Sequence, residues 1–128
     1  MSLADIPVDE TEKLSRFILF SKWLRSDQTV RSEAFIPHPY IDLSVTRQRN
    51  ISGSELWNLG KEVSTIRKCT LYGRADIFAE PVMKQNLTIE PSEPPLNHAN
   101  IKGYPEDKSK QKLIALELAA EACFIALG

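Results

Sequence analysis

The C-terminal segment from Glu106 to Leu127 constrains the fold of this chain more than any other feature. Its first turns are rich in charge, whereas the residues from Leu113 onward are apolar except for Glu117 and Glu121. The spacing and the acidic start predict one long helix over 106–127. Because its second half is apolar nearly all round, we expect that half to be buried on most sides. Two interpretations remain open: a central core helix, or a helix of which part also forms a homodimer interface.

Short strands are expected in four other segments, because they alternate apolar and polar residues or are bounded by turn residues. The clearest segment covers 41–45, where apolar and polar residues alternate without a break, and the others cover 71–77, 87–90 and 97–101. Together with the terminal helix they predict an α+β fold. In this fold a small mixed sheet of about four short strands packs on a long C-terminal helix, with one or two shorter helices.

The N-terminal region allows two interpretations. Asp9 and Glu12 have the spacing of a helix cap, and the apolar residues that follow predict a helix over 9–24. The apolar run 17–20 is also compatible with a strand, because a run this short has no decisive period. Residues 26–39 contain two prolines and are expected to form a loop.

A second helix start is better defined. Ser52 and Glu55 have the spacing of a capping box, and apolar residues follow directly. Gly60 suits the left-handed conformation that ends many helices. The sequence therefore predicts a two-turn helix over 52–60.

Length and composition indicate a single domain over residues 1–128, in which 1–8 are flexible and 1–3 are a possible cloning remnant. The formal net charge is −1, so no global field attracts nucleic acid or an anionic membrane. No apolar run has the length of a membrane span. We therefore expect a cytoplasmic protein that does not bind a membrane, for which nucleic acid is an unlikely partner. Cys69 and Cys123 are expected to be free thiols, with Cys123 in the helix core.

The chain lacks the motifs that identify common cofactor and metal enzymes. It has no Walker loop, no glycine-rich dinucleotide turn, no HExxH and no CxxC. His38 and His98 are its only histidines, which makes a histidine-rich metal centre improbable. We therefore expect neither a cofactor nor a bound metal.

Three residues are candidates for catalysis. Arg47 continues the buried phase of strand 41–45, so its guanidinium would end at the rim of the core, either beside an anion or paired with a carboxylate. Arg74 follows Gly73, which permits the close approach of a ligand or another backbone, although a simple pair with Asp76 is the alternative. His98 could act as acid or base, or be a structural histidine at a strand end.

Four further residues are candidates for binding an anion or another small ligand. Most of them belong to the polar segment 97–105, which lies between a predicted strand and the start of the terminal helix, where amide donors are free. These candidates are Lys102, Tyr72, Asn97 and Tyr104.

Two functional hypotheses follow. The first is a small cytoplasmic binding or adaptor protein that acts as a homodimer or in a larger complex, with a partner surface around Trp23, Trp57 and Tyr40. The second is a small metal-independent enzyme that acts on a phosphate-containing substrate such as a nucleotide or RNA. It would use His98 as acid or base, with two arginines, at 47 and 74, stabilising negative charge. The second hypothesis requires these three residues to converge in one cleft.

Overall fold

The computed structural model describes residues 3–37 and 39–127 of the chain, and six strands and three α-helices are found within these residues. His38, one of the two histidines of the sequence, lies outside the described residues. The predicted combination of helices and strands in one small fold is confirmed. In chain order the elements are β1 (Lys13–Ile18), η1 (Ser21–Trp23), η2 (Ser32–Phe35), β2 (Leu43–Arg47), α1 (Gly53–Arg67), β3 (Gly73–Phe78), α2 (Ala79–Met83), β4 (Thr88–Pro91), β5 (His98–Lys102), α3 (Lys108–Glu121) and β6 (Cys123–Ala126).

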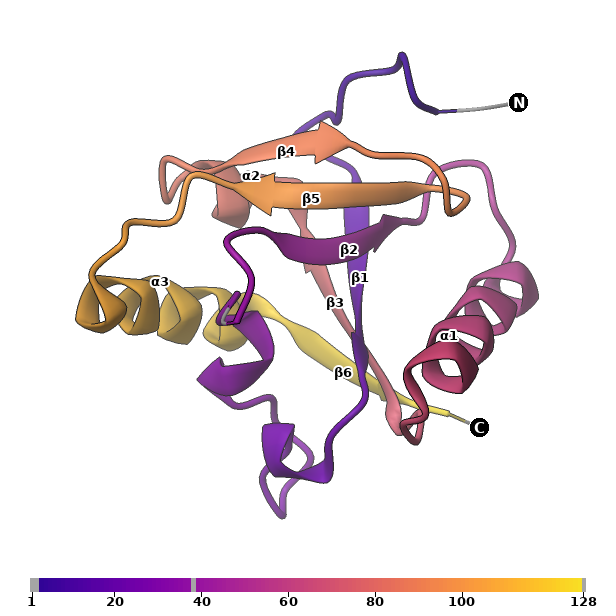
Figure 1. The fold of residues 1–128 in the computed structure, drawn as a ribbon, viewed down its shortest axis with the longest axis horizontal. Coiled ribbons are helices and arrows are strands. Elements are labelled where there is room, and N and C mark those ends of the chain that lie inside the picture. Colours follow the sequence, from indigo (N-terminus) through magenta and orange to yellow (C-terminus); the bar gives the residue numbers. More distant parts are fainter. Residues whose placement is uncertain (1–2, 38, 128) are drawn as a thin grey trace.

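The strands form one sheet in the order β4-β5-β2-β1-β3-β6, and every ladder between neighbours is antiparallel. The predictions of a mixed sheet and of about four strands were therefore wrong. In Figure 1, β1 and β3 run steeply across the direction of β2, β5 and β4. The sheet thus consists of two three-stranded halves that meet at β1 and β2.

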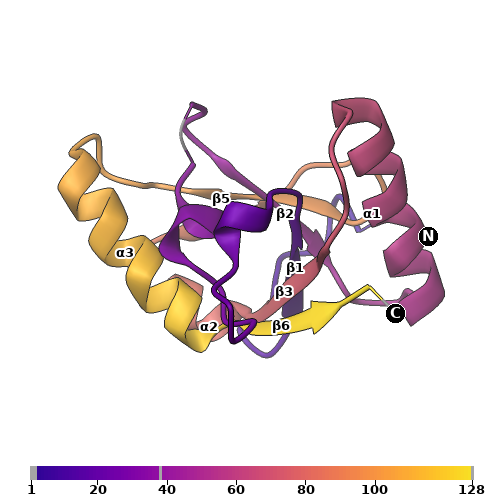
Figure 2. The same cartoon turned by 90° about the horizontal axis from the view of Figure 1, so that it is seen from below.

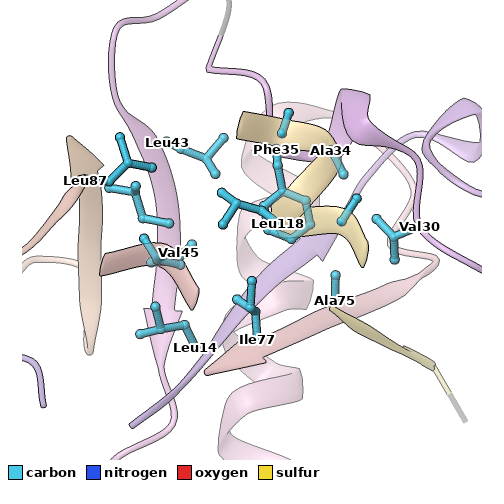
Figure 3. Packing of buried hydrophobic residues seen from close by; sticks show 14 of the residues in the cluster. Leu14, Val30, Ala34, Phe35, Leu43, Val45, Ala75, Ile77, Leu87 and Leu118 are labelled. Carbon is cyan, nitrogen blue, oxygen red and sulfur yellow. The ribbon is translucent and has the colours of Figure 1, made fainter. Parts of the chain in front are cut away.

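Helices cover both faces of this sheet. Figure 2 shows α1 on one side of the strands and α3 on the other. The larger apolar core lies on the α3 side, where Leu14, Val45 and Ile77 of the sheet pack with Phe35 of η2 and Leu118 of α3 (Figure 3). A smaller cluster lies under α1. Its buried members are Phe17, Leu19, Leu56 and Leu71.

The terminal helix is shorter and more exposed than the sequence suggested. It ends at Glu121, and Ala122 turns the chain into β6, which pairs with β3. Gly73 makes this pairing possible, because a Cβ at that position would lie 2.7 Å from the Phe124 ring. Only one face of α3 is buried, and Cys123 is an exposed free thiol on β6. The predicted helix over 106–127, its burial on most sides and the core position of Cys123 were wrong.

The helix predicted over 9–24 is absent, and β1 occupies its centre. The capping contacts do form: the Asp9 N–H donates to Glu12 Oε2, and the Thr11 N–H donates to Asp9 Oδ1, both at 2.8 Å. They close a tight turn that leads into a strand. Since β1 is buried on both faces of the sheet, its residues show no polar alternation, and the alternative of a strand in this region was the better one.

Helix α1 starts as predicted and continues past the expected end. Ser52 and Glu55 form the predicted capping box. Gly60, however, lies inside the helix and faces β1, where a Cβ would lie 2.8 Å from the Phe17 ring. Its role is therefore close packing, and the left-handed residue that ends the helix is Lys68. Among the described residues, no helix combines the length and hydropathy that a transmembrane segment requires.

Candidate ligand-binding cleft

The two halves of the sheet separate at a fork between β1 and β2. These strands pair directly only at Leu14 with Arg47 and at Ser15 with Thr46. Beyond this point β1 remains paired with β3 as far as Ile18, and β2 remains paired with β5. The central strands of the sheet therefore diverge, and the edge of β2 that faces β1 is left without a strand partner.

Arg16 fills the fork. Its Nε donates to the Ala34 carbonyl at 2.9 Å, and its Nη1 donates to the Ser44 carbonyl of β2 at 3.1 Å. Its guanidinium carbon lies 5.0 Å from the centre of the Trp23 ring. The side chain thus replaces part of the missing strand pairing. Since a guanidinium has five N–H groups and Arg16 uses two of them here, the others remain available to a ligand.

Two adjoining cavities open at the fork, with volumes of about 350 Å³ and 160 Å³. The larger one lies on the side of η1 and η2, and the smaller one lies between the sheet and α1. Both are lined by Arg16, Ser44 and Arg67. The combined space has the size of a small-molecule site.

Arg67, in the last turn of α1, brings a second guanidinium to this cleft. Within residues 3–37 and 39–127, neither Arg16 nor Arg67 forms an ion pair with a carboxylate. Burial, and to a lesser extent the positive charge of Arg67, lower the pKa of Arg16 to about 10. Arg16 stays charged at neutral pH, so two like charges line the cleft, and among the described residues no carboxylate is paired with either of them. This arrangement favours a bound anion.

Aromatic and polar side chains complete the larger cavity. Phe20 and Trp23 meet edge to face, with ring centres 4.9 Å apart. Tyr40 stands at the rim with 68% of its surface exposed. A third cation, Lys22, and two carboxylates, Glu33 and Asp42, also line this cavity. The walls therefore offer apolar contact and hydrogen-bond acceptors beside the cationic centre.

Glu33 remains ionised at this position. Burial raises the pKa of its carboxyl, but hydrogen bonds from its own backbone amide and from the Ser32 hydroxyl outweigh burial and leave the pKa below its ordinary value. A carboxylate only accepts hydrogen bonds. Glu33 is therefore suited to receive a hydroxyl or amino group of a ligand.

His98 lies in the smaller cavity, where it joins Arg16 and Arg67. Its Nδ1 is 3.0 Å from the Ser92 carbonyl oxygen, which can only accept, so Nδ1 carries the proton of the neutral ring. Nε2 then bears the lone pair. Nε2 has no hydrogen-bond partner among the described residues, and His98 is half-buried. The histidine therefore lines one cavity with two arginines, although they are not the two that the sequence suggested.

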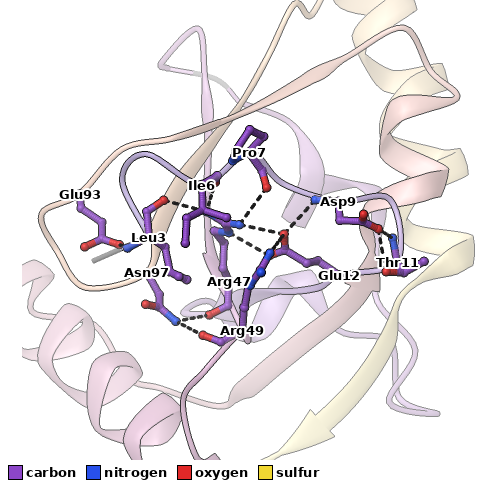
Figure 4. Close-up of polar contacts among 10 residues, drawn as sticks. All are labelled: Leu3, Ile6, Pro7, Asp9, Thr11, Glu12, Arg47, Arg49, Glu93 and Asn97. Carbon is purple, nitrogen blue, oxygen red and sulfur yellow. Dashed lines mark hydrogen bonds and ion pairs between the residues drawn. The ribbon is translucent and has the colours of Figure 1, made fainter. Parts of the chain in front are cut away.

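Arg47 lines neither cavity and lies on the face of the sheet opposite to His98, in a structural position. It is fully buried, and its Nε and Nη2 donate to the two oxygens of Glu12 at 2.8 Å each. The same guanidinium donates to the carbonyls of Leu3, Ile6 and Pro7, as Figure 4 shows. This is the carboxylate pairing that we considered as the alternative. Residues 3–7 belong to the segment expected to be flexible, and Arg47 anchors them.

Arg74 shares the α1 face of the sheet with His98 but lies far from it. Its Nε contacts both oxygens of Asp76 at 3.0 and 3.1 Å, and its guanidinium lies 4.6 Å from the Trp57 ring centre. Two strands stand between β3 and β5, which separates Asp76 from His98 by about 14 Å. Asp76 therefore cannot orient His98. The cleft that the second hypothesis required, with His98 and the arginines at 47 and 74, does not form.

None of the four predicted binding residues lines either cavity. The Lys102 ammonium contacts Glu90 at 3.5 Å and also Asp42, a carboxylate of the larger cavity, at 4.0 Å. Asn97 is buried in a turn, where its Nδ2 donates to the carbonyls of residues 47 and 49. Tyr104 donates to the Phe35 carbonyl at 2.8 Å, and burial raises the pKa of its hydroxyl. Tyr72 precedes β3 and is partly exposed.

Sequence reasoning missed Arg16 and Arg67 for identifiable reasons. Arg16 has the same phase as the buried Leu14 and Ile18, which is the signal that singled out Arg47, but the segment was interpreted as a helix. Arg67 was overlooked because the helix was expected to end at Gly60. A charged residue in the buried phase of an apolar run was the signal that could have found Arg16.

Comparison of the chain with protein-family models, with curated protein sequences and with solved structures found no match in any of the three. Among residues 3–37 and 39–127, no cluster of three or more His, Cys, Asp or Glu side chains could hold a metal ion.

Proposed function

We propose that this chain is a binding protein for a small phosphate-bearing ligand, held in the cleft at the β1–β2 fork. The observation that supports the proposal is the convergence of Arg16 and Arg67 in one cavity, with no carboxylate paired to either among the described residues. A phosphate group would neutralise both guanidiniums and would accept the N–H groups that Arg16 leaves free. The proposal keeps the class of binding protein expected from the sequence and gives it a defined site.

The walls of the cleft favour a phosphate monoester that carries a flat, apolar group, such as a nucleoside monophosphate. Phe20, Trp23 and Tyr40 supply aromatic surface beside the guanidiniums. Glu33 and Asp42 can accept hydrogen bonds from ribose hydroxyls or a base amino group. These carboxylates also disfavour ligands with more negative charge than the three cations can balance.

The proposal is tested by isothermal titration calorimetry with AMP and, separately, with inorganic phosphate. We expect AMP to bind more tightly than phosphate, because only AMP contacts the aromatic wall. Replacing Arg67 by Met should weaken AMP binding at least about tenfold, since charge-assisted hydrogen bonds to phosphate are lost. Lys61→Met is the matched control, because it removes an exposed cation from the same helix outside the cleft.

Three results would count against the proposal. One is the absence of heat and of chemical-shift change on titration with either probe at millimolar concentration. Another is an equal loss of AMP affinity in Arg67→Met and Lys61→Met, which would indicate a general effect of net charge. A third is AMP binding that moves the amide signals of another surface and leaves Ser44 and the residues around it unchanged.

His98 supports a second candidate function, a metal-independent reaction on the bound phosphate ester. Its Nδ1–H is fixed by the Ser92 carbonyl, so the Nε2 lone pair is available as a base in the cavity that it shares with the two arginines. Hydrolysis or transfer of a phosphate ester requires a base and cationic groups within reach of one phosphate, and these three residues line the same cavity. Arg16 and Arg67 would then take the role that the sequence suggested for the arginines at 47 and 74.

Release of inorganic phosphate or of a nucleoside from nucleotides tests this second candidate. Loss of turnover in His98→Gln, with AMP affinity unchanged within about twofold, would support an acid–base role. Turnover that survives in His98→Gln, or no turnover with any nucleoside mono-, di- or triphosphate, would leave the cleft as a binding site only.

A further inference from the structure

The exposed face of α3 carries an apolar stripe that the fold leaves uncovered. The buried face of the helix consists of Ala115, Leu118 and Ala119. On the opposite side Leu113 is 64% exposed and Leu116 is 43% exposed. At about 100° per residue, four residues share this outer side within about 60° of arc. They are Ser109, Leu113, Leu116 and Ala120, and all four are exposed.

A charged flank runs beside this stripe. Lys110, Glu117 and Glu121 lie within about 40° of one another on the helix surface. Their charges follow the order positive, negative, negative along the helix. All three side chains are exposed, and neither glutamate has an ion-pair partner within residues 3–37 and 39–127. Glu80 of α2 also lies beside the acidic end, but Lys84 pairs with it at 3.3 Å, so Lys84 is matched by Glu80, and Glu117 and Glu121 keep the negative excess of this end.

We propose that α3 pairs with α3 of a second copy of the chain, antiparallel and about a two-fold axis. In such a pair each flank of the helix meets the same flank of the copy in the opposite direction. The stripe alone sets the register. When the midpoint of the stripe lies on the two-fold axis, Leu113 faces Leu116 of the second copy, and Ser109 faces Ala120 of the second copy.

The charges independently fit the register that the stripe selects. In this register Lys110 comes to lie between Glu117 and Glu121 of the second copy, displaced from each by about 3 Å along the axis. Small side chains at Ser109 and Ala120 let the two helices approach closely at both ends of the contact. We expect a contact through one helix per copy to be smaller than the roughly 800 Å² per partner of a standard interface, which gives reversible dimers with a Kd on the order of 10 μM.

The test is sedimentation velocity on the full chain at concentrations from about 1 to about 500 μM. Wild type should change from monomer to dimer across this range, and Leu116→Glu should remain monomeric. Lys110→Glu should weaken the dimer at least about tenfold, because three carboxylates then face one another. The combined variant Lys110→Glu, Glu117→Lys, Glu121→Lys should recover the wild-type affinity, because the pairing is restored with its signs exchanged.

Ile66→Glu, at an 80% exposed position of α1, is the matched control and should dimerise as wild type does. Thermal unfolding checks that every variant folds, and AMP titration of Leu116→Glu separates this proposal from the ligand proposal, which involves other surfaces. Wild type that stays monomeric throughout would overturn the inference. So would a dimer that Leu116→Glu leaves intact, or a combined variant that remains as weak as Lys110→Glu.

Discussion

Arg47 and Glu12 form a buried pair in which two parallel hydrogen bonds of 2.8 Å join Nε and Nη2 to the two carboxylate oxygens. Arg16 is a second guanidinium inside the fold, two positions along β1 from Leu14, the residue that pairs with Arg47. Within residues 3–37 and 39–127, the hydrogen-bond and cation–π partners of its guanidinium are two carbonyls and the Trp23 ring. The first cation is neutralised by the chain itself, and the second is not. This difference separates an arginine that maintains the fold from one that we assign to ligand binding.

Removing Arg47 should strongly destabilise the protein. Arg47→Met leaves the Glu12 carboxylate and the carbonyls of three N-terminal residues without their donor, and breaking a buried pair in this way costs about 3–5 kcal/mol. Urea unfolding followed by circular dichroism measures the loss. The control is Arg49→Met, because 40% of the Arg49 side chain is exposed and its Nη1 lies 3.7 Å from the same carboxylate. We expect it to cost less than about 1 kcal/mol, and equal losses for the two variants would contradict the assignment.

Removing Arg16 should leave stability nearly unchanged and abolish binding of the phosphate ligand. Its charge is costly to bury, as its lowered pKa indicates, and a methionine of similar volume avoids that cost while losing two hydrogen bonds to carbonyls. The net change in the free energy of unfolding should therefore be within about 1 kcal/mol of zero. Urea unfolding and AMP titration of the same Arg16→Met sample provide both measurements. A large loss of stability with retained AMP binding would show that Arg16 is structural.

Acid should weaken the fold partly through Glu12. Burial raises the pKa of its carboxyl. Hydrogen bonds from Arg47 and the Asp9 amide, and the positive charges of Arg47 and Arg49, lower it by more, so the net pKa lies below the ordinary value of 4.5. Because the folded-state pKa lies below the unfolded one, the ionised carboxylate contributes stability above about pH 4.5, and this contribution is lost as the pH falls through the folded-state pKa. The stability difference between wild type and Glu12→Gln should be constant from about pH 5 to 7 and shrink below that range. A difference independent of pH down to about 3 would contradict this account.

Local signals predicted the parts of the fold that depend on a few neighbouring residues. The capping box of Ser52 and Glu55 and the buried phase of Arg47 both follow from spacing alone. The strand predicted over 41–45 forms two residues later, at Leu43–Arg47, and leaves Ile41 exposed. The carboxylate that pairs with Arg47 lies 35 residues away in the chain. No local pattern identifies such a partner.

The parts that sequence reasoning missed depend on contacts between distant segments. β1 is covered on both faces, so its sequence lacks the alternation of polar and apolar residues that would indicate a strand. Because the strand was not recognised, the buried position of Arg16 was not predicted either. Gly60 continues a helix because Phe17 packs against it. The cleft results from the divergence of β1 and β2. This divergence reflects the twist of the sheet, which no local sequence pattern predicts.

The C-terminal strand provides a last prediction, because its place beside β3 depends on the absence of a side chain at Gly73. A Cβ there would overlap the Phe124 ring and the Ile125 carbonyl oxygen. Gly73→Val should therefore detach β6, lower the free energy of unfolding by about 2–4 kcal/mol and remove the hydrogen-exchange protection of residues 123–126. Gly53→Ala is the matched control, since no atom lies within 4 Å of a Cβ at that helix position, and it should be neutral or stabilising by up to about 1 kcal/mol. Retained protection of 123–126 in Gly73→Val would show that β6 can pair with β3 without this close approach.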